Sequence, residues 1–205
     1  MKVIEINKQH MDQAAETLAL SFKDDPIFRY IFKTKEAYNK NAKWLFSTWV
    51  RWSVMFGKAW MTEDGNAVVL FRALGNADMS LWSMIRAGML PTPFRLGFAA
   101  FRRFYFEIVS TLDRKHTEVM GKTPHWYGWM IGVNPEHRGI GRHLMKHCAE
   151  IADEAQLPVF LETATDVNVS IYDYKGFEIK AKVTIAEGNF TLYFMVRQPQ
   201  KKTEE

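Results

Sequence analysis

The spacing of apolar residues predicts that the chain begins with one strand followed by helices. Residues 2–6 (KVIEI) read as a short strand, and apolar residues then recur at every third or fourth position, as on one face of a helix: Met11, Ala14, Leu18 and Phe22. Asn7 can cap this helix at its start. A second helix is expected to begin at Pro26, and residues 42–55 continue in a helical pattern.

Two strands and a helical insertion are expected next. The segments 58–63 (KAWMTE) and 67–74 (AVVLFRAL) flank Asp64, Gly65 and Asn66, which suit the positive φ angles of a tight hairpin. Between residues 75 and 122, six residues form an apolar stripe at helical spacing: Phe94, Phe98, Phe101, Tyr105, Ile108 and Leu112. We expect this stripe to pack into the core of the protein; the alternative is that it rests on a membrane or a partner.

The last 80 or so residues predict a strand, a loop and a helix, then three more strands. The strand 125–133 (HWYGWMIGV) leads through a loop to a helix that buries Leu144, Cys148, Ile151 and Ala155. A buried strand at 157–163, a short helix ended by Gly176 and two alternating strands within 177–196 follow. Residues 199–205 are expected to be a disordered tail.

Composition narrows the class of protein without naming it. With 205 residues and 47% apolar content, the chain suits a single domain over residues 1–198. A net charge of +4 permits an anionic ligand but is too small to indicate nucleic acid. The lone Cys148 excludes a disulfide framework and a multi-cysteine metal site, which agrees with a reducing cytoplasm. We see neither a signal peptide nor a membrane span, and therefore expect a cytoplasmic protein.

The stretch IGVNPEHRGIGRHLM (131–145) carries the chemistry that is easiest to interpret. Glycines at 139 and 141 allow a close approach of the backbone to a ligand, and the start of the following helix presents unpaired N–H groups, so the junction fits a pyrophosphate. It is not a dinucleotide fingerprint, because Leu144 stands where the third glycine belongs. A P-loop is also excluded, because His116 stands where its first glycine would precede Gly121-Lys122-Thr123.

In its order of parts the sequence resembles the GNAT superfamily of N-acetyltransferases, and within it the puromycin N-acetyltransferase-like group. The residues that carry the resemblance are HWYGWMIGVNPEHRGIGRHLM (125–145), FLET (160–163) and NVSIYDYKGFE (168–178), with a weaker echo in DDPIFRYIF (24–32). The resemblance implies an α/β fold of α+β type: a mixed, central, splayed β-sheet of about seven strands flanked by helices, with the helical insertion between the third and fourth strands. It also implies acetyl-CoA as cosubstrate, held where the fourth and fifth strands part.

The resemblance implies the cofactor-binding residues as well. Backbone groups around Ile131 and Val133 would pair with the pantetheine arm as an added strand does. The pyrophosphate loop matches Gly139, Ile140, Gly141 and Arg142, with Arg138 or Arg142 adding charge, and Asn168 matches the asparagine near the pantetheine. The loop departs from the family pattern, because Glu136 stands where Gln or Arg is usual and two residues are missing.

For catalysis the resemblance points to Tyr172, the tyrosine of a Y-x-x-x-G-F signature, as the acid that protonates the departing thiolate. A tyrosine is protonated at neutral pH, with a reference pKa of about 10, and can serve. The base that accepts the amine proton is open between His125, Glu162 and a water chain. Cys148 is read as a core residue rather than a nucleophile, and no metal is expected.

The expected function is acetyl transfer from acetyl-CoA to a primary amine of a small molecule by direct attack on the thioester. The alternative is a non-catalytic module that binds CoA or a surface. The insertion 75–122 is expected to line the acceptor side, with side chains such as Phe98 contributing. No nucleic acid or membrane span is expected, and the resemblance leaves a homodimer open.

Overall fold

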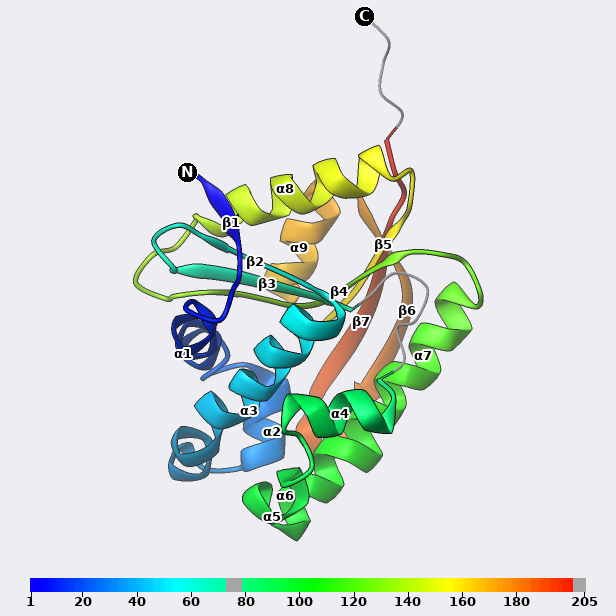
Figure 1. Ribbon diagram of the computed structural model, residues 1–205. Helices are drawn as coiled ribbons and strands as arrows, with labels where there is room; N and C mark the ends of the chain where they lie inside the picture. Colours follow the sequence, from blue (N-terminus) through cyan, green and yellow to red (C-terminus); the bar gives the residue numbers. More distant parts are fainter. Residues whose placement is uncertain (73–78, 201–205) are drawn as a thin grey trace, which may run out of the picture.

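The computed structural model describes residues 1–72 and 79–200 and contains one mixed β-sheet (Figure 1). Within these residues the sheet has seven strands: β1 (Val3–Glu5), β2 (Lys58–Thr62), β3 (Ala67–Arg72), β4 (Trp126–Val133), β5 (Val159–Thr163), β6 (Phe177–Ile185) and β7 (Phe190–Arg197). Their order across the sheet is β1-β2-β3-β4-β5-β7-β6. Only the β4–β5 pair is parallel among these strands; every other neighbouring pair is antiparallel.

Helices cover both faces of this sheet. Before β4 lie α1 (Met11–Ser21), α2 (Pro26–Phe32), α3 (Lys35–Phe56), α4 (Leu81–Ala87), α5 (Thr92–Leu96), α6 (Phe98–Phe101), the π-helix η1 (Arg102–Val109) and α7 (Ser110–Met120). After β4 lie α8 (Gly141–Glu154), α9 (Asp166–Tyr174) and the 3₁₀ turn η2 (Ala186–Gly188). Hydroxyl or carboxylate side chains accept N–H groups at the starts of α2, α3, α4 and α9 and so stabilise those helix ends: Asp25, Thr34, Ser80 and Thr165.

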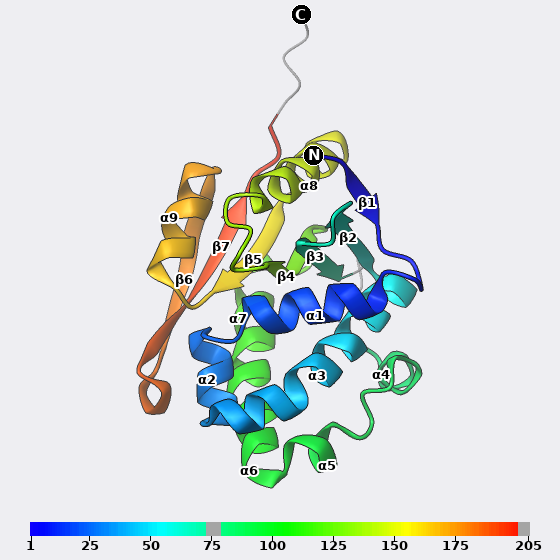
Figure 2. The same cartoon turned by 90° about the vertical axis from the view of Figure 1, so that its left-hand side faces the viewer.

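The apolar core is divided between the two faces of the sheet. One cluster joins α1, α2, α3 and the insertion to the side chains of Tyr127, Phe160 and Phe194. The other joins α8 and α9 to Phe71, Leu161 and other side chains on the opposite face. Figure 2 shows α1, α2 and α3 on one side of the sheet and α8 on the other.

The sheet opens between β4 and β5. Their pairing ends at Gly128 and Leu161, although β4 continues to Val133 and β5 to Thr163. Just beyond that pair β4 has a bulge, since Leu70 pairs with Met130 and Phe71 with Gly128, which leaves Trp129 without an opposite residue on β3. The divergence of the two central strands creates room for a ligand inside the sheet.

The expected architecture is confirmed: seven strands, flanking helices and a helical insertion between the third and fourth strands. Two details differ. Helix α1 begins at Met11 after His10, while Asn7 accepts the Gln9 N–H in a turn before the helix. The third helix is longer than expected and spans Lys35–Phe56.

Parts of three expectations lie outside the described residues: the end of the third strand at 73–74, the start of the insertion at 75–78 and the tail at 201–205. Residues 199–200 are described, and the Gln200 N–H donates to Asp153 Oδ1 over 2.8 Å. None of the helices in the described part of the chain is both long and apolar enough to cross a membrane.

Candidate active site

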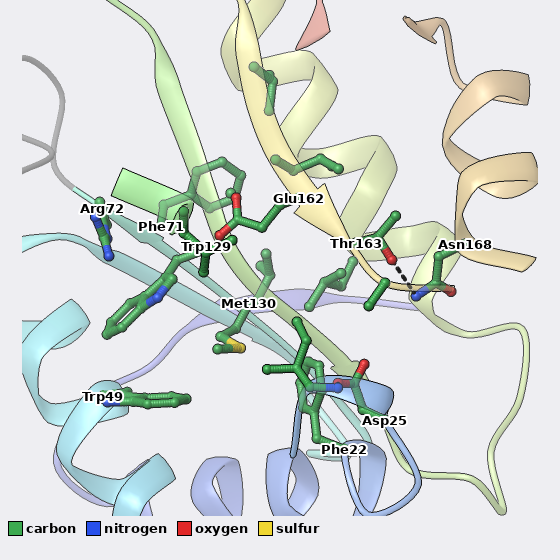
Figure 3. Close-up of a pocket in the computed structure, with 18 of the residues that line it drawn as sticks. Phe22, Asp25, Trp49, Phe71, Arg72, Trp129, Met130, Glu162, Thr163 and Asn168 are labelled. Atoms are coloured by element: carbon green, nitrogen blue, oxygen red, sulfur yellow. Dashed lines mark hydrogen bonds between the residues drawn. The ribbon is translucent and has the colours of Figure 1, made fainter. Parts of the chain in front are cut away.

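A cavity of about 1100 Å³ lies where β4 and β5 diverge. Residues of both faces of the sheet line it: Arg142, Lys146 and Tyr172 from α8 and α9, and Trp49, Phe104 and Trp129 from the side of α3 and the insertion. Figure 3 shows side chains of β3, β4, β5 and the start of α2 around it. The cavity therefore connects the two faces through the gap in the sheet.

The loop before α8 adjoins the cavity through Arg142, which lines it, whereas Arg138, Gly139, Ile140 and Gly141 are not among the lining residues. Gly139 has a φ angle of +87°, and a Cβ built there would meet no heavy atom within 4 Å, so the backbone is open to a ligand. At the start of α8, a Cβ on Gly141 would lie 2.8 Å from Val133 Cγ2. Arg142, beside the cavity, and the exposed Arg138 of the loop supply positive charge near the helix N-terminus. Glycines at 139 and 141, an unblocked backbone and these cations fit a pyrophosphate.

Beyond Gly128, β4 no longer pairs with β5, but part of this free edge is hydrogen-bonded within the protein. Ile131 lines the cavity, but the Val133 N–H donates to Ser21 Oγ of α1 over 3.0 Å. Pairing of a ligand with the Val133 N–H would require Ser21 to turn away. Asn168 also lines the cavity, and its Nδ2 donates to Thr163 Oγ1 at the end of β5 over 3.2 Å (Figure 3).

Tyr172 reaches the cavity from α9. Its ring is buried against Phe177, with 5.5 Å between ring centroids, within the cluster that α8 and α9 form. Burial, followed by the negative charges of Glu162 and Asp25, raises the pKa of the Tyr172 hydroxyl. The phenol therefore keeps its proton at neutral pH and can donate it.

Glu162 reaches the cavity from β5 and lies on the other face. Its Oε1 accepts the Tyr127 hydroxyl over 2.7 Å, while its buried Oε2 has no hydrogen-bond partner among the described residues. Burial raises the pKa of Glu162 to about 7, against the lowering effects of the Tyr127 hydrogen bond and the Arg72 guanidinium. A buried carboxylate with one open oxygen and a pKa near neutrality can accept a proton from a ligand.

The side on which each group lies follows from the strand periodicity. Phe160 belongs to the α1–α3 cluster and Leu161 to the α8–α9 cluster, so Glu162 projects on the α1–α3 face. Tyr172 belongs to the α8–α9 cluster. The gap thus has a proton acceptor on one face and a proton donor on the other.

Comparison with known proteins shows which family this chain is similar to. The sequence model of the Acetyltransferase (GNAT) family matches residues 95–177, which include β4, the loop, α8, β5 and α9. An uncharacterized N-acetyltransferase of Schizosaccharomyces pombe is 26% identical over 200 residues, which cover 94% of this chain and 81% of that protein. The chain is therefore similar to GNAT acetyltransferases over that stretch and, through the yeast relative, along most of its length.

Solved structures agree with this assignment at the level of the fold. A crystal structure described as histone acetyltransferase HPA2 and related acetyltransferase from Corynebacterium glutamicum has a TM-score of 0.68 and 18% identity, covering 99% of this chain and 98% of that one. The polyamine N-acetyltransferase of Drosophila melanogaster, which forms N-acetylagmatine, has a TM-score of 0.66 and 14% identity, covering 96% and 99%. The GNAT family uses acetyl-CoA, which is consistent with the loop and the gap.

The structure places His125 of this acetyltransferase away from the cavity. His125 precedes β4 at the end where β4 and β5 are still paired, and it is not among the residues that line the cavity. It is buried, with Nε2 2.7 Å from His116 Nε2 and Nδ1 2.7 Å from the Thr123 carbonyl oxygen. Both ring nitrogens therefore have partners within the protein, and Glu162 is the expected base that the structure brings to the gap.

Asp25 and Arg72 are cavity residues that the sequence patterns did not single out. Asp25 caps α2 by accepting the Ile27 N–H over 2.9 Å, and burial raises the pKa of its carboxyl to about 6. Arg72 ends β3, with its guanidinium 4.6 Å from the Tyr127 ring centroid and 3.4 Å from Asp113 Oδ1. In the sequence, Asp25 before Pro26 is typical of a helix cap. No pattern near Asp25 or Arg72 in the sequence indicates that either residue lines a cavity.

The insertion lines the cavity on the α1–α3 face, but not through Phe98; that this half receives the acceptor stays a prediction. Phe104, Ile108 and Leu112 face the cavity, and Phe104 stacks on Trp49 with 5.9 Å between ring centroids. Phe94 and Phe98 are 89% and 83% exposed. The expectation that the whole stripe packs into the core is therefore wrong for Phe94 and Phe98, and also for Tyr105, which is 43% exposed although it lines the cavity.

Proposed function

We propose that this acetyltransferase transfers an acetyl group from acetyl-CoA to the primary amine of a small molecule by direct attack on the thioester. The proposal rests on two groups on opposite faces of the gap between β4 and β5. Glu162, on the α1–α3 face, has one carboxylate oxygen without a hydrogen-bond partner among the described residues, and Tyr172, on the α8–α9 face, is protonated. Acetyl-CoA supplies an activated acyl group with a thiolate as the leaving group. The protein must then position the amine, accept a proton from its nitrogen and donate a proton to the departing sulfur.

Each residue has a distinct part in this proposal. Gly139, Ile140, Gly141, Arg142 and Arg138 would hold the pyrophosphate, and Asn168 and the free edge at Ile131 would hold the pantetheine arm. Glu162 would take the proton of the attacking amine at Oε2, and Tyr172 would give its hydroxyl proton to the departing sulfur. Asp25 is another carboxylate that lines the cavity, and burial raises its pKa to about 6, so it is an alternative proton acceptor.

The walls of the acceptor side favour an amine with an apolar body. Tryptophan, phenylalanine and methionine side chains predominate there, including Trp49, Phe104, Trp129 and Met130. A polyamine would bring a second ammonium group into this apolar half, where Glu162 and Asp25 have raised pKa values and Arg72 is a cation. We therefore propose a monoamine with an aromatic or aliphatic body. Puromycin, which gives its name to the group that the sequence resembles, carries one primary amine on an aromatic body and is one candidate, although the sequence itself does not name the acceptor.

Thiol release from acetyl-CoA, measured with a panel of amines, tests the proposal. The panel contains phenethylamine and puromycin as apolar amines, and agmatine and spermidine as polyamines. Amine-dependent thiol release with the apolar amines is expected. Binding of CoA without turnover of any amine would favour the non-catalytic alternative, and preference for the polyamines would contradict the proposed acceptor class.

Substitution Gly141→Asp is expected to abolish the thermal stabilisation that CoA gives the wild-type protein. A Cβ at this position meets Val133, and the carboxylate adds a negative charge where the proposed pyrophosphate lies. Thermal unfolding with and without CoA measures the loss. Ala155→Asp is the control, because Ala155 is exposed at the C-terminal end of the same helix α8 and does not line the cavity. A full CoA shift in a folded Gly141→Asp protein would move the cofactor site elsewhere.

Substitution Phe104→Ala is expected to raise KM for the amine by about tenfold, because it removes apolar contact area from the acceptor side. KM for acetyl-CoA should be unchanged. The control is Phe98→Ala, which removes an exposed ring that does not line the cavity and should leave both constants unchanged. Equal effects of the two substitutions on the amine KM would contradict the assignment of the acceptor side.

A further inference from the structure

The end of the molecule formed by α5 and α6 combines exposed apolar side chains with an excess of positive charge. In both ribbon views α5 and α6 form the end opposite the C-terminus (Figures 1 and 2). Leu90, Phe94 and Phe98, in and just before these helices, are 63%, 89% and 83% exposed. Fully solvated phenylalanine rings are unfavourable unless something covers them.

The positive charge of the chain is concentrated in the same region. Residues 26–40, which form α2 and the start of α3, together with 79–112 contain eight of the 27 Lys and Arg residues and two of the 23 Asp and Glu residues. The rest of the chain therefore holds 19 basic and 21 acidic residues and is slightly negative. Helix α5 packs against α3, and α6 packs against α2 and η1, so the two helices that carry the exposed rings adjoin the elements that carry most of these cations.

The geometry points to an anionic lipid surface as the partner: we propose that the end formed by α5, α6 and the start of α3 binds the surface of a bilayer containing acidic phospholipids. Aromatic and leucine side chains insert at the boundary between headgroups and acyl chains, and lysine and arginine neutralise acidic headgroups. A second copy of this chain would instead bring two positively charged surfaces together, which repel each other. The charge excess thus favours a negatively charged partner over self-association.

The cavity opens on this side of the molecule. Leu81, Ile85 and Leu90 are exposed and also line the cavity. An amine with an apolar body concentrates at a bilayer surface, so a protein seated there would receive its acceptor from the membrane. This last consequence rests on the proposed function, whereas binding to the bilayer does not.

Sedimentation with vesicles tests the proposal. Wild-type protein is expected to sediment with vesicles of phosphatidylcholine and phosphatidylglycerol in equal proportion, less at high salt, and not with phosphatidylcholine alone. The double substitution Phe94→Ser and Phe98→Ser should lower partitioning by about tenfold. Val167→Ser, which removes an exposed apolar side chain on α9, is the matched control and should have no effect.

A second, purely electrostatic variant keeps the test independent of the aromatic residues. Lys35→Gln with Lys40→Gln, at exposed positions of α3, should lower partitioning by roughly tenfold with an unchanged melting temperature. No sedimentation of the wild type with acidic vesicles would overturn the proposal, and so would full binding by the folded Phe94→Ser, Phe98→Ser protein. Light scattering that shows a dimer which this double substitution dissociates would assign the surface to self-association and overturn it as well.

Discussion

Substitution Tyr172→Phe is expected to lower kcat by roughly 10² to 10⁴, the usual contribution of a positioned general acid. The change keeps the ring and its packing on Phe177 and removes only the hydroxyl. Because burial and the nearby carboxylates raise the pKa of this hydroxyl, it is protonated throughout the neutral range and its loss cannot be compensated by a change of pH. KM for acetyl-CoA should barely move, since the hydroxyl acts at the departing sulfur.

Steady-state kinetics with an accepted amine gives the measurement, and Tyr193→Phe is the matched control. Tyr193 also carries a hydroxyl on a packed ring, but that hydroxyl donates to Asp166 over 2.7 Å and the residue does not line the cavity. Tyr193→Phe should retain wild-type kcat. If Tyr172→Phe also kept wild-type kcat with chemistry rate-limiting, Tyr172 would have only a packing role, and solvent would protonate the thiolate.

Substitution Glu162→Gln is expected to lower kcat/KM for the amine by roughly 10² to 10⁴ at neutral pH, because the amide cannot accept the amine proton. The pH profile should change as well. A base acts only when deprotonated, and burial raises the pKa of Glu162 to about 7, so wild-type kcat/KM should rise with pH through about 7 and then level off. Glu162→Gln should lose this rise.

Substitution Tyr127→Phe provides a second test of Glu162 as the base. The Tyr127 hydroxyl donates to Glu162 and lowers the pKa of the carboxyl, so its removal should raise that pKa and move the rise in kcat/KM to higher pH. An ascending limb near neutral pH that persists in Glu162→Gln would belong to another group, such as Asp25 if it is centred at about 6, and would remove Glu162 from the role of base. A rise at higher pH, where the amine itself loses its proton, is expected in both proteins.

The sequence revealed the parts of the site that are local in the chain. Gly139, Gly141 and Arg142 occupy one strand-to-helix junction, and Tyr172 lies at a fixed spacing before Gly176 and Phe177, so short patterns point to them. Glu162 was named because it lies near the end of the fifth strand, where the resemblance places the reacting carbonyl. Arg72 and Asp25 come from another strand and a helix cap, and only the folded chain brings them to one cavity. Tyr127 does not line the cavity but donates its hydroxyl to Glu162.

Two expectations depended on geometry that periodicity cannot supply. His125 directly precedes one central strand and Glu162 lies in the other, but the sequence does not tell at which end those strands part. The pairing of Gly128 with Leu161 shows that they diverge after the start of β4. The aromatic stripe assumed one regular helix over residues 94–112. Gly97, with a φ angle of +77°, and the π-helix at Arg102–Val109 break that period, so Phe94 and Phe98 no longer share a face with Ile108.

The most direct test of the central proposal is mass spectrometry of the products formed from acetyl-CoA and an apolar primary amine such as phenethylamine. The account predicts one N-acetylated amine per CoA released, at a rate that falls steeply in both Tyr172→Phe and Glu162→Gln. Release of CoA without acetylated amine, or acetylation at the wild-type rate in both variants, would contradict it.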